Sequence, residues 1–510
     1  MRSGHAGVIL PLSAAPSSTS WGIGELPDVG PVADWLASAG FDRLMLLPLT
    51  PPSDGTASPY STASMMAIAP WYIALHQVED FLEAGGTSAL ARTTRARLET
   101  ARRSPRVEYG AVELVKHEAL TLAFERFEVD HWAPASARGL AFADYVKRQA
   151  WWLDDYATFQ TLKEARPEPS WRGWPKALRN REPAAIVDAL VGQERAVRRH
   201  KYWQWLADGQ WRDGRDRARA AGVEVIGDLP FAAGTESADV WARASEHRFS
   251  ASIGAPPDAF NRKGQRWGLP PYRWDKVEAS DYEVVKLRAR RMAELYDGFR
   301  IDHATGWFRM YVRPRSGKPG YEPKGRAAQR RQGERVIQIL KDSGARLLAE
   351  DLGRVPTFVR ESLTEMGVPG CKVIRWERAR TKGRPFVDPK TYPAASVTMT
   401  GTHDTETLAG WWDGASTRER AALLALPAMR RRGLKPTDPW SDAVRDALLE
   451  LAWTSRSDDV YVMAQDLFGW RDRINTPGTV GPDNWTWRLG GGRSPPSPIL
   501  ENWTSGEKAE

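Results

Sequence analysis

The chain has 510 residues, of which 42% are hydrophobic and 27% are charged. This balance is typical of a soluble globular protein, and it excludes a disordered or fibrous one. The formal net charge is +8, but the basic runs, such as that at residues 430–432, are short and scattered. We therefore expect no nucleic-acid partner, because a nucleic-acid interface concentrates its basic residues on one element.

Two further counts bound the protein class. Tryptophan is unusually frequent, with 24 residues against 13 Tyr and 14 Phe. This excess predicts either an aromatic-rich core or platforms for flat or ring-shaped ligands. The single cysteine, Cys371, excludes an intramolecular disulfide, favours a reducing compartment and is expected to be a core thiol. No apolar run near the N-terminus has the length of a signal peptide or membrane span, so we expect a cytoplasmic protein without a membrane partner.

Short runs of β-branched and aliphatic residues recur along the chain, and each ends in a polar or charged residue. Such runs are typical of strands buried on both faces of a parallel sheet. Helical patterns separate many of them, as at residues 31–39, 282–296 and 329–342. This alternation predicts an α/β fold, a (β/α)₈ TIM barrel formed by one catalytic domain over residues 1–510. The predicted strands are Gly7–Ser13, Arg43–Leu49, Val223–Asp228, Gly298–His303, Ala345–Asp351, Cys371–Glu377, Ser396–Asp404 and Tyr461–Asp466.

Two segments interrupt this rhythm. Residues 50–222, between the second and third strands, are too long for a structureless loop and carry helical patterns at 112–127 and 139–166. We predict a large, mostly helical insertion there, packed on the barrel. Residues 249–275, after the third strand, are rich in Gly, Pro and aromatic residues and predict an ordered loop.

Polar residues at the carboxyl ends of barrel strands are the first catalytic candidates in this fold. Each one alone is equally explained as a cap of the following helix, since Asp is a good N-cap residue. As a set they should converge on one mouth, where an unpaired buried carboxylate has no structural use. The strand-end residues are Asp228, Asp302, His303, Glu350, Asp351, His403, Asp404 and Asp466.

The fourth and fifth strands suggest a division of roles. Arg300 and Asp302 are two residues apart and so point to the same side, where the Arg would lower the Asp pKa. Glu350 and Asp351 face opposite ways, so only one enters the mouth. The apolar residues before Glu350 would raise its pKa and keep it protonated as a general acid. An ionised Asp opposite a protonated Glu is the pairing of retaining glycoside chemistry.

A metal site is the rival interpretation, with His303, His403, Asp302 and Asp404 as ligands. Against it, the sequence has no HxH, HExxH or CxxC spacing, and it also lacks phosphate-loop and dinucleotide fingerprints.

The order of several motifs resembles a known family. Trp21–Asp28 (WGIGELPD), Leu47–Ser61 (LPLTPPSDGTASPYS), Gly254–Asp275, GFRIDH, Thr400–Trp412 (TGTHDTETLAGWW) and Asn475–Arg488 are similar to segments of the 4-α-glucanotransferases of glycoside hydrolase family 77, the amylomaltases or disproportionating enzymes. The resemblance runs nearly end to end. It implies a retaining transferase that moves α-1,4-glucan segments from a maltooligosaccharide or glucan donor to the 4-hydroxyl of an acceptor sugar, without a metal or other cofactor.

The resemblance also implies roles for residues. Asp302 would be the nucleophile, Glu350 the acid/base and Asp404 the third carboxylate, which binds sugar hydroxyls. The residues implied to bind substrate or to orient these groups are Arg300, His403, Tyr60, Asp228, Asp258, Trp274 and His303. Residues 249–275 would cover the active site, with Asp258 and Trp274 toward the acceptor. A retaining α-1,4-glucan hydrolase with the same carboxylates and a non-catalytic carbohydrate-binding protein remain alternatives, and the oligomeric state stays open.

Overall fold

The structure, a computed structural model, describes residues 4–53, 56–257, 263–379, 385–479 and 481–489. Eight parallel strands close into a barrel in the order β1-β12-β11-β10-β9-β6-β3-β2, and the predicted TIM barrel is confirmed. One strand falls within or overlaps each predicted run. The strands are β1 His5–Leu10, β2 Arg43–Leu46, β3 Glu224–Leu229, β6 Gly298–Ile301, β9 Arg346–Ala349, β10 Gly370–Val373, β11 Ser396–Met399 and β12 Asp459–Met463.

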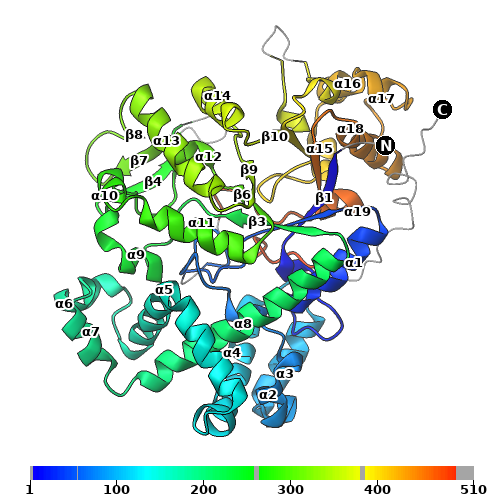
Figure 1. Cartoon of the computed structure of the whole chain (residues 1–510). Helices are drawn as coiled ribbons and strands as arrows, with labels where there is room; N and C mark the ends of the chain where they lie inside the picture. Colours follow the sequence, from blue (N-terminus) through cyan, green and yellow to red (C-terminus); the bar gives the residue numbers. More distant parts are fainter. Residues whose placement is uncertain (1–3, 54–55, 258–262, 380–384, 480, 490–510) are drawn as a thin grey trace.

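Several strands are shorter than predicted at their carboxyl ends. β11, for example, ends at Met399, so that His403 and Asp404 lie in the turn that follows it. Such turn residues face the barrel mouth, because apolar side chains fill the interior of the barrel. Helices connect the strands and surround the barrel (Figure 1). They include α1 Val29–Ser38, α11 Glu283–Leu295, α12 Ala304–Phe308, α13 Arg326–Lys341, α14 Thr357–Glu365, α15 Leu408–Gly414, α16 Thr417–Leu424, α17 Pro427–Arg430, α18 Asp442–Trp453 and α19 Ala464–Phe468.

The segment between β2 and β3 is mostly helical, and Figure 1 shows its helices gathered on one side of the barrel, below it in this view. α8 packs against α1 and β3 and thus takes the place of a barrel helix, while its other end packs against α5. The helices of this segment are α2 Glu79–Glu83, α3 Arg92–Arg103, α4 Tyr109–Phe127, α5 Ala137–Ala165, α6 Lys176–Arg179, α7 Pro183–Leu190 and α8 Glu194–Ala220.

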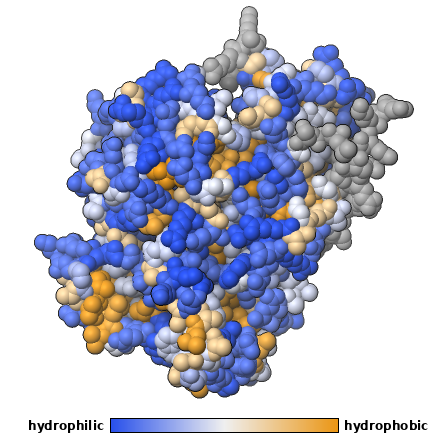
Figure 2. Space-filling view, viewed as in Figure 1, coloured by the Kyte–Doolittle hydropathy of each residue, from blue (hydrophilic) through white to orange (hydrophobic). Residues whose placement is uncertain are grey.

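The aromatic residues of this segment explain much of the tryptophan excess. Trp203 and Trp211 of α8 belong to the same buried cluster as the barrel core, and Trp205 packs against Phe127 in it. A second buried cluster joins α5 to the segment after β3 through Trp174 and Trp241. The face shown in Figure 2 is mainly hydrophilic, with an apolar patch over α7, where Val187 is 66% exposed.

Residues 249–275 are more regular than the predicted loop. β4 Ala251–Ala255 and β5 Gln265–Arg266 lie in it, and they join β7 Met310–Pro314 and β8 Gly320–Glu322 in a small antiparallel sheet in the order β5-β4-β7-β8. β7 and β8 follow β6 and were not predicted. This sheet and the helices α9 Ala238–Ala242 and α10 Trp274–Ala279 lie on the barrel side occupied by the βα connections after β3 and β6.

Candidate active site

Arg300 of β6 lies at the centre of the strand-end carboxylates. Its guanidinium donates through Nη1 to Asp228 Oδ2 at 2.5 Å and through Nη2 to Glu350 Oε2 at 2.8 Å. A longer contact of 3.3 Å joins Nη1 to Asp302 Oδ1. The backbone explains this convergence, because β6 pairs Arg300 with Asp228 of β3 on one side and with Leu348 of β9, two residues before Glu350, on the other.

The two central carboxyls, those of Asp302 and Glu350, interact directly with each other. Asp302 and Glu350 are hydrogen-bonded to each other through their side chains. Burial, only partly offset by Arg300, raises the pKa of Asp302 well above its usual range. Burial alone would also raise the pKa of Glu350, but the charge of Arg300 and a hydrogen bond from the His303 backbone N–H at 2.9 Å hold it below its usual value.

This distribution reverses the expectation drawn from the sequence, in which Arg300 lowers the Asp302 pKa and apolar neighbours raise that of Glu350. The physical reason is distance, since the guanidinium lies closer to Glu350 than to Asp302. Asp302 is therefore the more readily protonated carboxyl of the pair in the absence of substrate.

A second wall of the mouth is built from Tyr60, His403 and Asp404. The Tyr60 hydroxyl donates to Asp228 Oδ2 at 2.6 Å and lies 3.0 Å from His403 Nδ1. The Tyr60 and His403 rings stack with centroids 4.5 Å apart. His403 Nε2 in turn lies 3.6 Å from Asp404 Oδ1. Burial lowers the pKa of His403, so the imidazole is neutral at pH 7 and serves as a hydrogen-bonding group.

His303 lies at the start of α12, with a left-handed backbone (φ 46°). Burial lowers its pKa as well. Its ring packs nearly perpendicular to those of Phe231 and Trp267, at centroid distances of 5.4 and 5.1 Å. Trp267 comes from the segment expected to cover the site, so an aromatic residue of that segment does reach the mouth.

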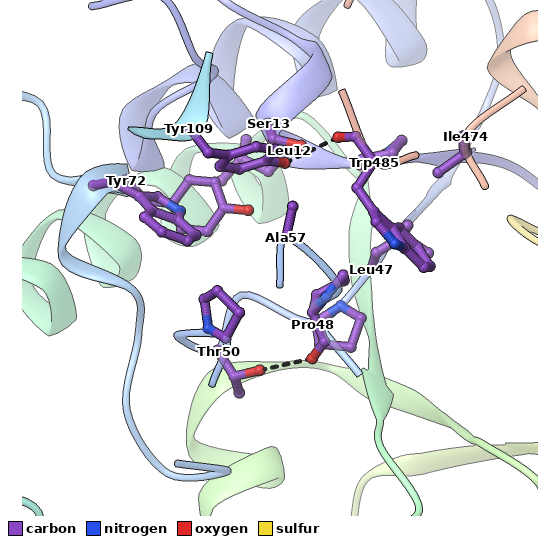
Figure 3. A pocket seen from close by; sticks show the side chains of 14 residues that line it. Leu12, Ser13, Leu47, Pro48, Thr50, Ala57, Tyr72, Tyr109, Ile474 and Trp485 are labelled. Atoms are coloured by element: carbon purple, nitrogen blue, oxygen red, sulfur yellow. Dashed lines mark hydrogen bonds between the residues drawn. The ribbon is translucent and has the colours of Figure 1, made fainter. Parts of the chain in front are cut away.

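A pocket continues from the second wall toward the helical segment (Figure 3). Its sides include Trp71, Tyr72, Tyr109 and Trp485, with the hydroxyl-bearing Ser13 and Thr50 between them. Figure 3 shows Tyr72 and Trp485 on opposite sides of this space. The Trp485 ring also lies beside the rings of Tyr60 and His403, at centroid distances of 5.8 and 5.6 Å. Tyr60 and His403 therefore separate this pocket from the carboxylates.

Comparison with known proteins decides the family. The family model described as 4-alpha-glucanotransferase matches residues 10–492. A 4-alpha-glucanotransferase of Thermus thermophilus is 33% identical over 470 residues, which cover 89% of each chain. That of Chlamydia pneumoniae is 30% identical over 497 residues, covering 95% of this chain and 91% of the relative. The chain belongs to the 4-alpha-glucanotransferase family.

Solved structures agree on the fold of this 4-alpha-glucanotransferase family member. An amylomaltase from Streptococcus agalactiae in complex with acarbose superposes with a TM-score of 0.81 at 23% identity, covering 98% of this chain and 97% of that one. The amylomaltase of Corynebacterium glutamicum gives 0.77 at 24% identity, covering 96% of this chain and 71% of its own. The protein is thus an enzyme of the 4-α-glucanotransferase type, and the hydrolase alternative is not favoured.

The remaining predicted site residues lie in different places. Asp258 falls outside the described residues. Trp274 begins α10, and its ring packs against Tyr272 and Trp307 at 5.3 and 6.4 Å, whereas Trp267 is the aromatic that touches His303.

Two of the strand-end carboxylates, those of Asp351 and Asp466, form hydrogen bonds within the barrel framework of this glucanotransferase-family enzyme. Asp351 faces away from the mouth and accepts from Arg360 Nε at 2.8 Å, as the opposite orientation of Glu350 and Asp351 predicts. Asp466 accepts the Leu408 backbone N–H at 2.6 Å at the start of α15, so its contact is with a helix other than the one that follows its strand.

The metal alternative gains no support. Among the described residues, no group of three or more His, Cys, Asp and Glu side chains is arranged to hold a metal ion. In the same part of the chain, no helix is long and apolar enough to cross a membrane.

Asn475 was not among the predicted site residues, yet its side chain contacts one of them. Asn475 Nδ2 donates to Asp404 Oδ1 at 2.6 Å. It lies in an irregular segment after α19, where neither strand nor helix periodicity marks a residue. The sequence carried a signal only in the family-like motif Asn475–Arg488, which assigned no role to its first residue.

Proposed function

We propose that the enzyme cleaves an α-1,4-glucan donor, such as a maltooligosaccharide, with retention and transfers the freed segment to the 4-hydroxyl of an acceptor sugar. Asp302 acts as the nucleophile and Glu350 as the acid/base. The observation that carries this proposal is the convergence of the two carboxyls on one Arg300 guanidinium, at 2.8 Å for Glu350 and 3.3 Å for Asp302. Inverting enzymes instead hold their carboxyls about 6.5–9.5 Å apart to admit a water between them.

The first step follows from this geometry. A sugar that enters between the two carboxyls breaks their hydrogen bond, and in the bound complex Glu350 must carry a proton while Asp302 is ionised. The carboxylate of Asp302 attacks the anomeric carbon, the bond from that carbon to the leaving oxygen breaks, and Glu350 gives its proton to that oxygen. Arg300 stabilises Asp302 as the ionised nucleophile that this attack requires.

The second step reverses the roles. An acceptor 4-hydroxyl gives its proton to Glu350 and attacks the anomeric carbon, which releases Asp302. Asp404, beside neutral His403, binds sugar hydroxyls, and Tyr60 presents its ring to the same sugar. Trp267 and the aromatic pocket of Figure 3 favour sugar over water as the attacking group and accommodate a longer donor chain. The single buried cysteine supports a reducing, cytoplasmic location, which immunoblotting of cell fractions would test.

Incubation with maltotriose tests the proposal. Transfer produces glucose together with maltotetraose, maltopentaose and longer oligomers, whereas hydrolysis releases glucose and maltose only. Asp302→Asn should abolish both activities without loss of folding. Asp351→Asn is the matched control, because its carboxylate lies at an adjacent strand end but pairs with Arg360 outside the mouth; this variant should melt earlier and keep the product ladder. Glucose and maltose alone from the wild type, or full turnover by Asp302→Asn, would refute the proposal.

A further inference from the structure

Asp404 is held differently from the other two central carboxylates. Its side chain is 45% exposed, against 20% for Asp302 and 22% for Glu350. It lies in the turn after β11, and its side-chain contacts are with Asn475 and His403 rather than with Arg300. An exposed Asp in a turn has several side-chain rotamers available to it, so a fixed orientation needs a partner.

Asn475 supplies that partner. Its side-chain amide donates to Asp404 Oδ1 at 2.6 Å, on the oxygen that also faces His403. Arg473 adds a second contact to the same residue, since its Nη2 donates to the Asp404 main-chain oxygen at 2.9 Å while its Nε donates to the Asn475 main-chain oxygen at 3.1 Å. Both the backbone and the carboxylate of Asp404 are thus fixed from one short piece of chain.

We propose that Asn475 is a positioning residue, which holds the carboxylate of Asp404 in the orientation that binds the sugar during glycosyl transfer. The proposal rests on the proposed function, because it assigns Asp404 to substrate binding in that reaction. Asn475 acts through Asp404, and a neutral amide is suited to this task because it donates a hydrogen bond without competing for a proton.

Asn475 is itself held on both sides. The main-chain oxygen of Ile474, which is buried, accepts from the Trp485 backbone N–H at 2.6 Å. The backbone N–H of Thr476 donates to Asn484 Oδ1 at 3.0 Å. Trp485 has a left-handed backbone (φ 68°), a costly conformation for a bulky residue that persists only where surrounding contacts fix it.

These contacts extend to the helical segment between β2 and β3. The Tyr109 hydroxyl donates to the Trp485 main-chain oxygen at 3.0 Å, and the Val107 backbone N–H donates to the Thr486 main-chain oxygen at 2.8 Å. Arg488 donates to main-chain oxygens at the end of α3, including that of Ser104 at 2.7 Å. The orientation of Asp404 is therefore fixed through residues 473–479 and 481–489 against the helices that flank the pocket.

The most informative variant is Asn475→Asp, which keeps the shape and replaces the donor by a carboxylate next to Asp404. Two carboxylates in contact cannot both ionise easily, so the pKa of the pair rises. The acidic limb of the kcat/KM profile for maltotriose should move to higher pH by about one unit or more. Asn475→Ala should lower kcat/KM about 10- to 100-fold, mainly through kcat, as expected for loss of a hydrogen bond to a charged group.

Asn484→Asp is the matched control. It introduces the same charge into the same segment, but its side chain contacts Thr476 and Thr479 rather than Asp404. It should leave the acidic limb in place, whatever it does to the melting temperature. An unshifted limb in Asn475→Asp, or a kcat/KM of Asn475→Ala within about threefold of wild type, would overturn the proposal. If Asn475→Asp does not fold, Asn475→Ala decides alone. Wild-type protein that fails to disproportionate maltotriose would instead refute the proposed function.

Discussion

Replacing Arg300 by methionine removes the positive charge at the centre of the site and keeps an unbranched, though shorter, side chain. Arg300 is 4% exposed and contacts three carboxylates, those of Asp228, Asp302 and Glu350. Without it, these groups lose the counter-charge that favours their ionised forms. We expect Arg300→Met to be less stable than wild type and nearly inactive.

The magnitudes follow from the contacts. Breaking a buried ion pair by removing one partner costs about 3–5 kcal/mol of folding free energy. The loss should be largest above pH 7 and smaller near pH 5. The direction of this pH dependence follows from the carboxyls of Asp302 and Glu350. Without Arg300 their folded-state pKa values rise, and a carboxyl with a raised folded-state pKa loses its contribution to stability as the pH rises. Two charge-assisted hydrogen bonds, at about 1.5–3 kcal/mol each, correspond to a fall in kcat/KM of roughly 10²- to 10⁴-fold.

Thermal melting between pH 5 and 8.5 and initial rates on maltotriose measure the two effects. Arg360→Met is the control, since Arg360 pairs with Asp351 on the outer side of the neighbouring strand end. It should reduce the melting temperature and leave kcat/KM near wild type. An Arg300→Met protein with kcat/KM within tenfold of wild type, or with a stability loss that is independent of pH, would refute the reasoning.

Three other variants test separate contacts. Tyr60→Phe keeps the ring and removes the 2.6 Å hydrogen bond to Asp228, so kcat/KM for maltotriose should fall about tenfold; unchanged kinetics would contradict the assigned wall. Trp267→Ala opens the mouth beside His303, and chromatography of the products should show a larger hydrolytic share; an unchanged ratio of maltose to maltotetraose would contradict it. Lys116→Met leaves the fully buried Glu25 without its cation, and melting should show a larger loss at pH 8.5 than at pH 6.

The sign of the last prediction follows from Glu25. Burial raises the pKa of Glu25 from 4.5 to about 7, even though Lys116 opposes the shift. A carboxyl whose folded-state pKa is raised contributes most stability at low pH and loses that contribution as the pH rises through the folded value. Removing Lys116 raises the value further and enlarges the loss at alkaline pH. Equal destabilisation at both pH values would contradict this account.

The barrel could be predicted because each of its strands has a local signature. Runs such as Val223–Asp228 and Ala345–Asp351 are apolar on both faces and end in a carboxylate, which only a buried parallel strand explains well. The small antiparallel sheet has no such signature. β5 has two residues, and β4 pairs with β7 across a long separation, Ala251 with Pro314, so its partners could not be found from neighbouring sequence.

The site was predicted to the extent that it lies at strand ends. Asp302, Glu350 and Arg300 meet because the barrel brings neighbouring strand ends together. Which carboxyl lies nearer the guanidinium depends on side-chain geometry across strands, so the spacing of Arg300 and Asp302 along one strand gave the wrong order of pKa values. Asn475 escaped prediction because its position depends on contacts made by an irregular segment.

The central claim is that Asp302 forms the covalent bond to the sugar, and trapping that intermediate tests it most directly. Glu350→Gln protein incubated with α-maltotriosyl fluoride, a donor that needs no acid to leave, should accumulate a glycosyl-enzyme. Peptic digestion and tandem mass spectrometry should place a maltotriosyl mass on Asp302. A label on Asp404 or on any other residue, or fluoride release with an inverted product, would contradict the account.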